Sequence, residues 1–292
     1  MSQSLEKHQQ KITKENFVTP VLERSITPED FGSNLQQTFT DQPGFAFLSS
    51  AIIPGSGQAV NKNWFRSGLY LAIEAVSIYF MLDYKNRGQR RERNYEQYVD
   101  QNWSVVQYAN WIIDYHEMNG LNNPYLADLK TMMEGTSASF NTSIDWNKVD
   151  LELLRNAERN TAYIVTDNFA ANNFSHTLPG YGSQQYYELV SKYYQFQSGW
   201  NDYYEFHQSN NINAYQIDRN GRSTSPMFYE GVKRAQRFND DFRFSKNLLS
   251  LLIANHFISA FDSYFTFKLK QNRIITTTSV IPGQQFQLRY NF

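Results

Sequence analysis

The sequence predicts a mostly α fold, with an apolar helical hairpin and bundle, an inserted soluble helical region and a small C-terminal β-hairpin. Two apolar stretches, 68–82 and 246–269, approach the length of a membrane helix and are separated by a long polar and aromatic segment. Within that segment apolar residues recur at helical spacing, whereas two-residue alternation marks the C-terminal end. These three patterns set the fold class.

Residues 1–43 predict an extended polar arm, because they are turn-rich and no long apolar period follows their prolines. They contain no apolar core of a signal peptide. Two interpretations stay open: either the protein is not exported, or a signal peptide preceded this numbering and was removed.

Residues 44–118 predict an apolar helical hairpin followed by a long helix. Proline removes a backbone donor and glycine permits unusual dihedral angles, so we expect a turn inside the hairpin. The residues of this turn are Pro54, Gly55, Gly57 and Gln58. From 64 to 118 the pattern predicts one very long helix or two collinear helices, with Gly88 as the weakest point.

Residues 119–245 predict a soluble, aromatic-rich helical region, with helical patterns at 150–168, 183–207 and 229–241. The densest aromatic residues are candidates for binding a partner: Tyr186, Tyr187, Tyr193, Tyr194, Trp200, Tyr203 and Tyr204. Aromatic faces supply contact area at low entropic cost, so one interpretation is a recognition surface for a protein, a glycan or lipid headgroups. The other interpretation, equally open, is the core of a small helical domain.

Residues 246–270 predict an apolar helix that packs on 44–84. Its polar residues recur at intervals of four, three and four and form one stripe: Asn255, Ser259, Asp262 and Thr266. Glu74 lies in the middle of the other apolar stretch, where an ionised carboxylate facing lipid is costly. Glu74 is therefore the natural partner of the stripe.

Residues 271–292 predict a C-terminal β-hairpin around Pro282. Large apolar side chains alternate with polar ones along its second half: Phe286, Leu288, Tyr290 and Phe292. This pattern indicates either an ordinary edge hairpin or a strand that adds to the sheet of a partner.

Neither apolar stretch is a convincing independent membrane span, because 68–82 is short and 246–269 carries a polar stripe. Together they favour membrane contact, since a mostly apolar helix with one polar stripe requires neighbours of its own kind. A basic run at 85–93 begins just past the first stretch, where headgroups would lie. The alternative is a soluble bundle whose longest helices keep one buried polar network.

Composition excludes several function classes. The net charge of −1 gives no electrostatic argument for binding nucleic acid, which is therefore not an expected partner. The absence of cysteine excludes disulfides and cysteine-ligated metals. The histidines are scattered without the spacing of a zinc site: His8, His116, His176, His207 and His256. The PGSGQ turn matches no phosphate-binding loop, so we expect neither a metal nor a cofactor.

An acid–base site is the main catalytic alternative. It could be built from Glu74, His256 and Asp262 if the two apolar helices pack together, because buried ionisable groups mark functional sites. His256 and Asp262 are six residues apart and do not share a helix face. The favoured interpretation is a non-catalytic polar network that fixes helix register, made of these three residues with Asn255 and Ser259.

One segment resembles a known family. The residues Pro54, Gly55, Gly57, Gln58, Asn61, Lys62, Gly68 and Glu74 form the pattern P-G-x-G-Q-x-x-N-K…G…E. This pattern resembles an uncharacterised family of Gram-negative envelope proteins, a domain of unknown function, in which a short apolar hairpin precedes a membrane helix. Asn255, His256, Ser259 and Asp262 resemble its second motif block. The resemblance implies membrane localisation and no known enzymatic activity, although the middle of this chain is larger than such a family needs.

The sequence therefore predicts a non-catalytic, membrane-associated structural or interaction protein of a bacterial envelope. Its expected partners are membrane lipid and an envelope protein, and the sequence does not distinguish the inner from the outer membrane. The enzyme with a buried acid–base site and the soluble helical bundle are the alternatives.

Overall fold

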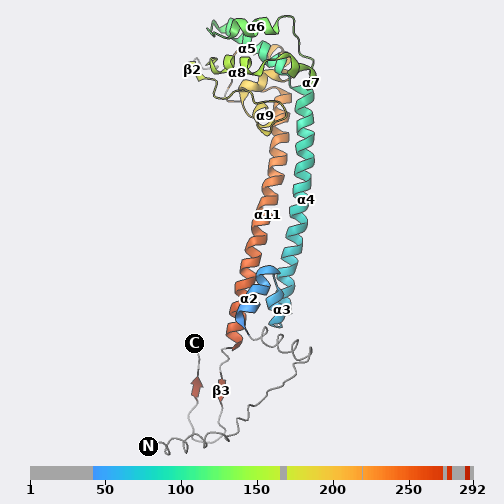
Figure 1. Cartoon of the computed structure of the whole chain (residues 1–292), viewed down its shortest axis with the longest axis vertical. Coiled ribbons are helices and arrows are strands. Elements are labelled where there is room, and N and C mark those ends of the chain that lie inside the picture. The colour runs from blue at the N-terminus through green and yellow to red at the C-terminus, as the bar shows by residue number, and fades with distance from the viewer. Residues whose placement is uncertain (1–41, 165–169, 219, 272–274, 278–286, 290–292) are drawn as a thin grey trace, which may run out of the picture. The chain divides into compact units, whose positions relative to one another are not determined.

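The computed structural model describes residues 42–164, 170–218, 220–271, 275–277 and 287–289. In these residues the chain is mostly helical, as the sequence predicts (Figure 1). It divides into two compact units whose boundaries both fall inside long helices. Unit 1 takes the described residues up to Leu71 and from His256 onward, and unit 2 is Ala72–Asn255. All but the last two residues of the predicted arm at 1–43 lie outside the described residues.

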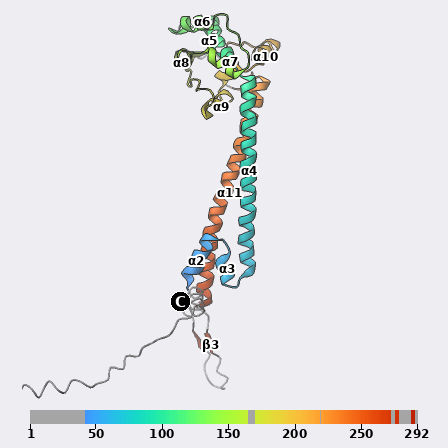
Figure 2. The same cartoon turned by 45° about the vertical axis from the view of Figure 1, so that its right-hand side comes forward.

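Unit 1 is a helical hairpin packed on the end of a long helix (Figure 2). The hairpin consists of α2 (Pro43–Ile52) and α3 (Ser56–Val60), and the long helix is α11 (Pro226–Gln271). Proline at the start of α2 suits the first helical turn, where its missing N–H would have no partner. The turn between α2 and α3 lies where the sequence predicts it, and Gly55 there has a φ of 92°.

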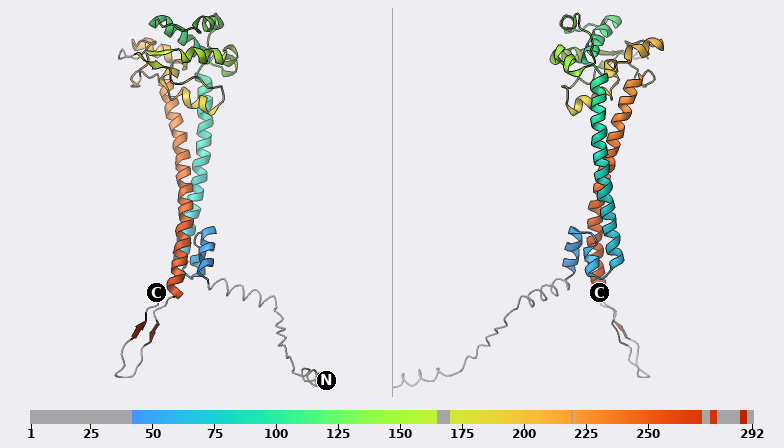
Figure 3. Two further views of the ribbon diagram at one scale, coloured as in Figure 1. Left: turned by 60° about the vertical axis from the view of Figure 1, so that its left-hand side comes forward. Right: turned by 90° about the vertical axis from the view of Figure 1, so that its right-hand side faces the viewer.

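Unit 2 contains most of two long helices that run antiparallel side by side, α4 (Trp64–Asn102) and α11 (Figure 3). Gly88 does not weaken α4, which is continuous through it. A Cβ at Gly88 would lie 2.9 Å from the ring of Phe242, so the glycine permits close approach of α11. Helix α11 also merges two segments that the sequence treats separately, 229–241 and 246–269, and crosses the predicted boundary at 245.

The sequence predicts one very long helix or two collinear helices at 64–118, and the structure has two helices, the first of which ends at Asn102. A new helix, α5 (Val105–Asn119), begins there because the Ser104 hydroxyl caps it by accepting a hydrogen bond from the Gln107 N–H at 3.2 Å. Gly120, in the left-handed conformation, ends α5.

Short elements complete unit 2. They are α6 (Leu126–Met133), α7 (Thr142–Asp145), η1 (Trp146–Lys148), α8 (Leu151–Arg159), β1 (Ala162–Ile164), β2 (Ala170–Asn173), α9 (Gln184–Val190), η2 (Tyr194–Gly199) and α10 (Tyr203–Ser209). The helix predicted over 150–168 stops at Arg159, and β1 then pairs antiparallel with β2. The helix predicted over 183–207 is three short pieces, because Ser183 caps α9 while turns separate α9, η2 and α10.

The core of unit 2 is aromatic and centres on α5. Three tryptophans are fully buried, Trp103, Trp111 and Trp200, and each indole N–H donates to a backbone carbonyl at 2.8–3.0 Å. Buried aromatic residues are stable where their polar atoms find such partners. The core is therefore both apolar and hydrogen-bonded.

At the C-terminal end, β3 (Ile275–Thr277) pairs antiparallel with β4 (Gln287–Arg289). Residues 278–286 between them, and with them Pro282 and Phe286, lie outside the described residues, as do Tyr290 and Phe292. The C-terminal β-hairpin therefore stays a prediction.

Candidate functional site

The turn between α2 and α3 is buried, and its backbone N–H groups bind serine side chains. The Gly55 N–H donates to the Ser259 hydroxyl of α11 at 2.7 Å, and the Gly57 N–H donates to the Ser50 hydroxyl of α2 at 2.8 Å. The first N–H groups of any helix have no partner within the helix. Here the hydroxyls of Ser259 and Ser50 accept the hydrogen bonds of the N–H groups at the start of α3, so no water molecule is needed there.

Gln58 is the centre of this polar network and is fully buried. Its amide oxygen accepts hydrogen bonds from the Ser50 and Ser259 hydroxyls, each at 3.1 Å. Its amide nitrogen donates to the Ser259 carbonyl at 2.8 Å and to the Asp262 carboxylate at 3.0 Å. A glutamine amide can donate two hydrogen bonds and accept two, so the capacity of Gln58 is saturated.

The same network ties other backbone groups of the hairpin to α11. The Asn61 amide donates to the Ser263 carbonyl at 3.0 Å, and the Ser263 hydroxyl donates to the Ala46 carbonyl. The His256 Nδ1 lies 2.7 Å from the Ala51 carbonyl oxygen, which can only accept, so this nitrogen carries the proton. Side chains of α11 thus meet the hairpin along its whole length.

The predicted register residues take separate partners. Asp262 binds Gln58 and forms an ion pair with Arg66 at 2.7 Å. In unit 2, the Asn255 amide donates to the Glu74 carboxylate at 2.9 Å, the pairing that the polar stripe predicts. The three residues of the acid–base alternative, Glu74, His256 and Asp262, thus each have a hydrogen-bonding partner of their own.

Glycine is required where the hairpin helices touch. A Cβ at Gly57 would collide with the Ala46 carbonyl oxygen and lie 2.5 Å from the hydroxyls of Ser50 and Ser263. A Cβ at Gly55 would lie 2.5 Å from the Ser67 carbonyl oxygen. The two glycines therefore permit the backbone contact that places Gln58 in the network.

The apolar residues of the long helices face outward. Within the described residues, α4 and α11 are the two helices long and apolar enough to cross a membrane. Over the most apolar 18 residues of each helix, only 11% of the residues of α4 and 28% of those of α11 are buried. Exposed large side chains there include Leu71, Val76, Ile78, Phe80, Leu82, Leu249, Leu251, Ile253, Phe257, Phe261 and Phe265. A core helix of a soluble bundle would instead be mostly covered by its own chain.

The basic run at 85–93 has two roles. Arg87 and Arg91 form ion pairs with Asp241 of α11 at 2.9 and 2.8 Å, and Asp241 is buried. The ion pairs of the described residues do not include Lys85, Arg90 or Arg93, all of which are exposed. Part of the run therefore joins the two helices, and the rest faces outward just past the apolar stretch.

The partner-binding candidates separate into two groups. Tyr186, Trp200 and Tyr203 are buried in the aromatic core of unit 2, so the prediction of a recognition surface is wrong for these three. Tyr187, Tyr193, Tyr194 and Tyr204 are half-buried and pack on the edge of this core. The sequence did not reveal the division, because the aromatic residues of this segment follow no single helical period.

Unit 2 also buries a carboxyl group, that of Glu158 on α8. It accepts hydrogen bonds from the Tyr108 hydroxyl at 2.7 Å and the Leu178 N–H at 2.8 Å. Burial raises the pKa of Glu158 to about 7, although these hydrogen bonds and the charges of Arg155 and Arg159 act against the shift. Within the described residues, no group of three or more histidine and carboxylate side chains is placed to hold a metal ion.

Sequence reasoning missed four residues of the network. Ser50, Asn61, Arg66 and Ser263 contribute hydrogen bonds or an ion pair that no pattern had assigned to them. A signal for one of them was present: Ser263 lies four residues after Ser259, so it shares the helix face of the stripe.

Comparison with known proteins gives one match. Residues 39–150 match the profile of a family of unknown function (DUF5683). No curated protein and no solved structure matches the chain significantly. The matched residues contain the hairpin and Gln58, whereas their partners Ser259, Asp262 and Ser263 lie outside the match.

Proposed function

We propose that this protein is a non-catalytic membrane protein of a bacterial envelope, in which α4 and α11 cross the bilayer. The part of unit 2 that lies outside the bilayer would interact with a partner protein. The hairpin of α2 and α3 would enter the membrane beside α11 without crossing it. The outward-facing apolar windows of α4 and α11 carry this proposal.

Hydrogen bonding supports the placement of the hairpin in lipid. Irregular backbone at membrane depth is tolerated only where the protein itself provides its hydrogen-bonding partners. The turn at Gly55 and Gly57 meets this condition through Ser259 and Ser50. The role of the polar network is then to fix how the hairpin and α11 pack, because lipid gives apolar surfaces no reason to prefer one register.

Helix length supports two crossings. At 1.5 Å per residue, the 39-residue α4 and the 46-residue α11 are about 58 and 69 Å long, against about 30 Å for the hydrocarbon layer. Each helix would continue well beyond the membrane. The exposed basic residues Lys85, Arg90 and Arg93 would then meet lipid headgroups.

Extraction of the full-length protein from membranes of its host tests the proposal. We expect alkaline carbonate to leave the protein in the membrane pellet and detergent to release it. Release by carbonate alone would contradict the membrane crossing and favour the soluble bundle.

Cysteine labelling tests the topology, because the chain has no cysteine of its own. Two crossings place Asp128→Cys and Lys268→Cys on opposite sides of the membrane. An impermeant maleimide should therefore label only one of them in sealed vesicles. Equal labelling of both positions in vesicles shown to be sealed would contradict the crossing.

The enzyme alternative has its own test. Replacing Glu74 by Gln would abolish turnover and preserve the fold if Glu74 were a catalytic acid or base. As a partner of Asn255, Glu74 instead contributes to stability alone, and we expect the Gln variant to lower the unfolding temperature.

A further inference from the structure

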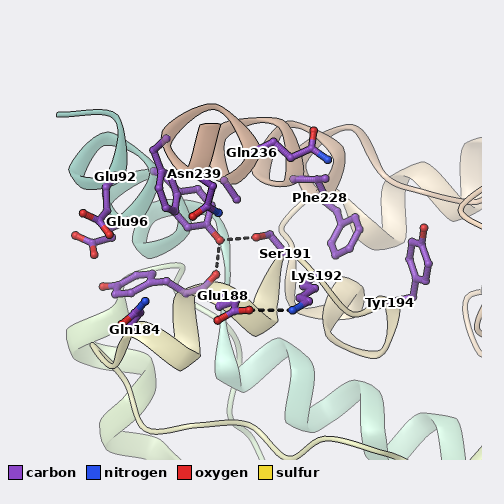
Figure 4. A pocket seen from close by; sticks show the side chains of 15 residues that line it. Glu92, Glu96, Gln184, Glu188, Ser191, Lys192, Tyr194, Phe228, Gln236 and Asn239 are labelled. Carbon is purple, nitrogen blue, oxygen red and sulfur yellow. Dashed lines mark hydrogen bonds and ion pairs between the residues drawn. The ribbon is translucent and has the colours of Figure 1, made fainter. Parts of the chain in front are cut away.

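A cavity of about 410 Å³ lies in unit 2, where α4, α9 and α11 meet (Figure 4). This volume is within the range of small-molecule and side-chain binding sites, roughly 300–1,000 Å³. One wall is apolar and is made by Phe228, Val232, Ala235 and Phe238 of α11. The cavity can therefore hold an apolar stem.

The floor of the cavity is fixed by its own hydrogen bonds. The Tyr95 hydroxyl lies 2.5 Å from the Ser191 hydroxyl and donates to the Tyr187 carbonyl. Glu188 and Lys192 form an ion pair at 2.9 Å and neutralise each other. These groups shape the cavity, but their charges and hydrogen bonds are already matched.

Two carboxylates at one end of the cavity, unlike the groups of its floor, are not matched by a partner. Glu92 and Glu96 are one helical turn apart on α4, and Figure 4 shows them together at the end away from Phe228 and Tyr194. Both are half-buried, and among the described residues neither carboxylate takes part in an ion pair or a side-chain hydrogen bond. Burial raises the pKa of Glu96, and the charges of Glu92 and Asp100 raise it further, while Arg93 opposes them. A cation at this end would relieve the repulsion.

The rim carries amides that suit a peptide. Gln184, Gln236 and Asn239 line the cavity, and side-chain amides both donate and accept hydrogen bonds, as a peptide backbone does. A small free amine would not reach these amides, which would then form hydrogen bonds only with water. The rim therefore favours a segment of a protein over a small molecule.

We propose that this cavity binds a lysine-bearing segment of a partner protein, with the ammonium group between Glu92 and Glu96 and an adjacent apolar side chain against Phe228 and Val232. The proposal extends the interaction role of unit 2 and does not depend on the membrane crossing. Binding to soluble peptides can therefore succeed or fail independently of membrane extraction.

Calorimetric titration of the full-length protein in detergent micelles tests this site. The probes are acetyl-Ala-Lys-Phe-amide, its Gln analogue acetyl-Ala-Gln-Phe-amide, and hexylamine. We expect the lysine peptide to bind at least tenfold more tightly than the glutamine peptide. Each carboxylate contributes part of the attraction for the ammonium group, so Glu92→Gln or Glu96→Gln should weaken lysine-peptide binding about threefold and the double variant about tenfold.

The controls separate the site from general electrostatics. Asp128→Asn removes an exposed carboxylate elsewhere in unit 2 and should leave binding unchanged. Equal affinity for the two peptides, no detectable binding, or a double variant that binds like the unaltered protein would overturn the proposal. Hexylamine that binds as tightly as the lysine peptide, with the same dependence on Glu92 and Glu96, would overturn the assignment to a protein segment.

Discussion

In unit 1 the buried side chains are small or polar, such as Ser50, Gln58, Ser259 and Ser263, and large apolar side chains such as Phe261 face outward. Around α5 in unit 2 the buried side chains are aromatic. Tryptophans and tyrosines fill the interior, and the indole N–H groups of the three buried tryptophans donate to backbone carbonyls. Unit 1 thus buries small polar side chains and exposes large apolar ones, whereas the region around α5 buries its large aromatic side chains.

The difference is what we expect if unit 1 packs in lipid, as proposed, and the region around α5 packs in water. In water, burial of aromatic area drives packing, and hydrogen bonds satisfy the polar remainder. In lipid, apolar burial between helices gains little, so close contact through glycine and hydrogen bonds must determine the arrangement. Unit 1 has both features, at Gly57 and Gln58.

The largest expected effect comes from the aromatic core. Trp103→Ala removes a buried indole that packs against Gly199 and donates to the Phe196 carbonyl. We expect unit 2 to lose about 3–5 kcal/mol of unfolding free energy, measured by denaturation followed by circular dichroism. Met118→Ala, on the exposed face of α5, is the control and should change stability little. Similar small losses in both variants would show that the aromatic cluster is not the core.

The buried carboxyl of Glu158 makes the stability of unit 2 depend on pH. Its pKa is about 7 in the folded protein and near 4.5 in the unfolded chain, so the folded state binds the proton more tightly. Stability is therefore lost as the pH rises from about 4.5 to 7, by roughly 3 kcal/mol. Glu158→Gln resembles the protonated form and should not show this loss. A stability difference between the two proteins that stays constant from pH 5 to 8 would contradict the assignment.

Gly57→Ala tests the close contact in unit 1. The added Cβ must push α3 away from Ala46 of α2 and from Ser263 of α11, and overpacking of this kind costs about 1–3 kcal/mol. Gly68→Ala on α4 is the matched control, because nothing lies near its Cβ and alanine favours a helix. We expect the first change to lower the unfolding temperature and the second to maintain or raise it. The reverse order would mean that the hairpin does not pack on α11 in this way.

Gln58→Leu tests the polar network with the smallest expected loss. Leucine fills similar space but leaves the Ser259 carbonyl and two hydroxyls without the amide, and on the proposed placement in lipid this costs about 1–2 kcal/mol. Hydrogen exchange at the Gly55 and Gly57 amides should increase, since Ser259 and Ser50 would lose their common partner. Unchanged exchange in the variant would argue that the serines hold the turn without Gln58.

The hairpin turn and the polar stripe of α11 could be predicted from local sequence. Proline and glycine between two apolar segments predict the turn, and intervals of four and three place Asn255, Ser259 and Asp262 on one face. The pairing of Glu74 with Asn255 is expected from the cost of a carboxylate among apolar residues. Gln58 was assigned to the turn alone, because its partners on α11, Ser259 and Asp262, lie about 200 residues away and no local pattern connects them.

Less of unit 2 could be predicted. Its aromatic residues occur on several faces of short elements, so periodicity does not separate Tyr186, which is buried, from Tyr187, which lines the cavity. The end of α4 depends on the Ser104 cap, a single hydroxyl within an otherwise helical pattern. Long-range contacts decide which tyrosines are buried, and they are visible only in the fold.

The accessibility of single spin labels tests most directly whether the apolar faces of α4 and α11 contact lipid. Labels attached at Ile78→Cys and Phe257→Cys, both outward-facing, are compared with one at Gln97→Cys, which lies on α4 beyond the apolar stretch. In reconstituted membranes we expect collisions with oxygen to dominate at positions 78 and 257, and collisions with a water-soluble nickel chelate to dominate at 97. Labels at 78 and 257 that respond to the nickel chelate as strongly as the label at 97 would place these faces in water and contradict the membrane account.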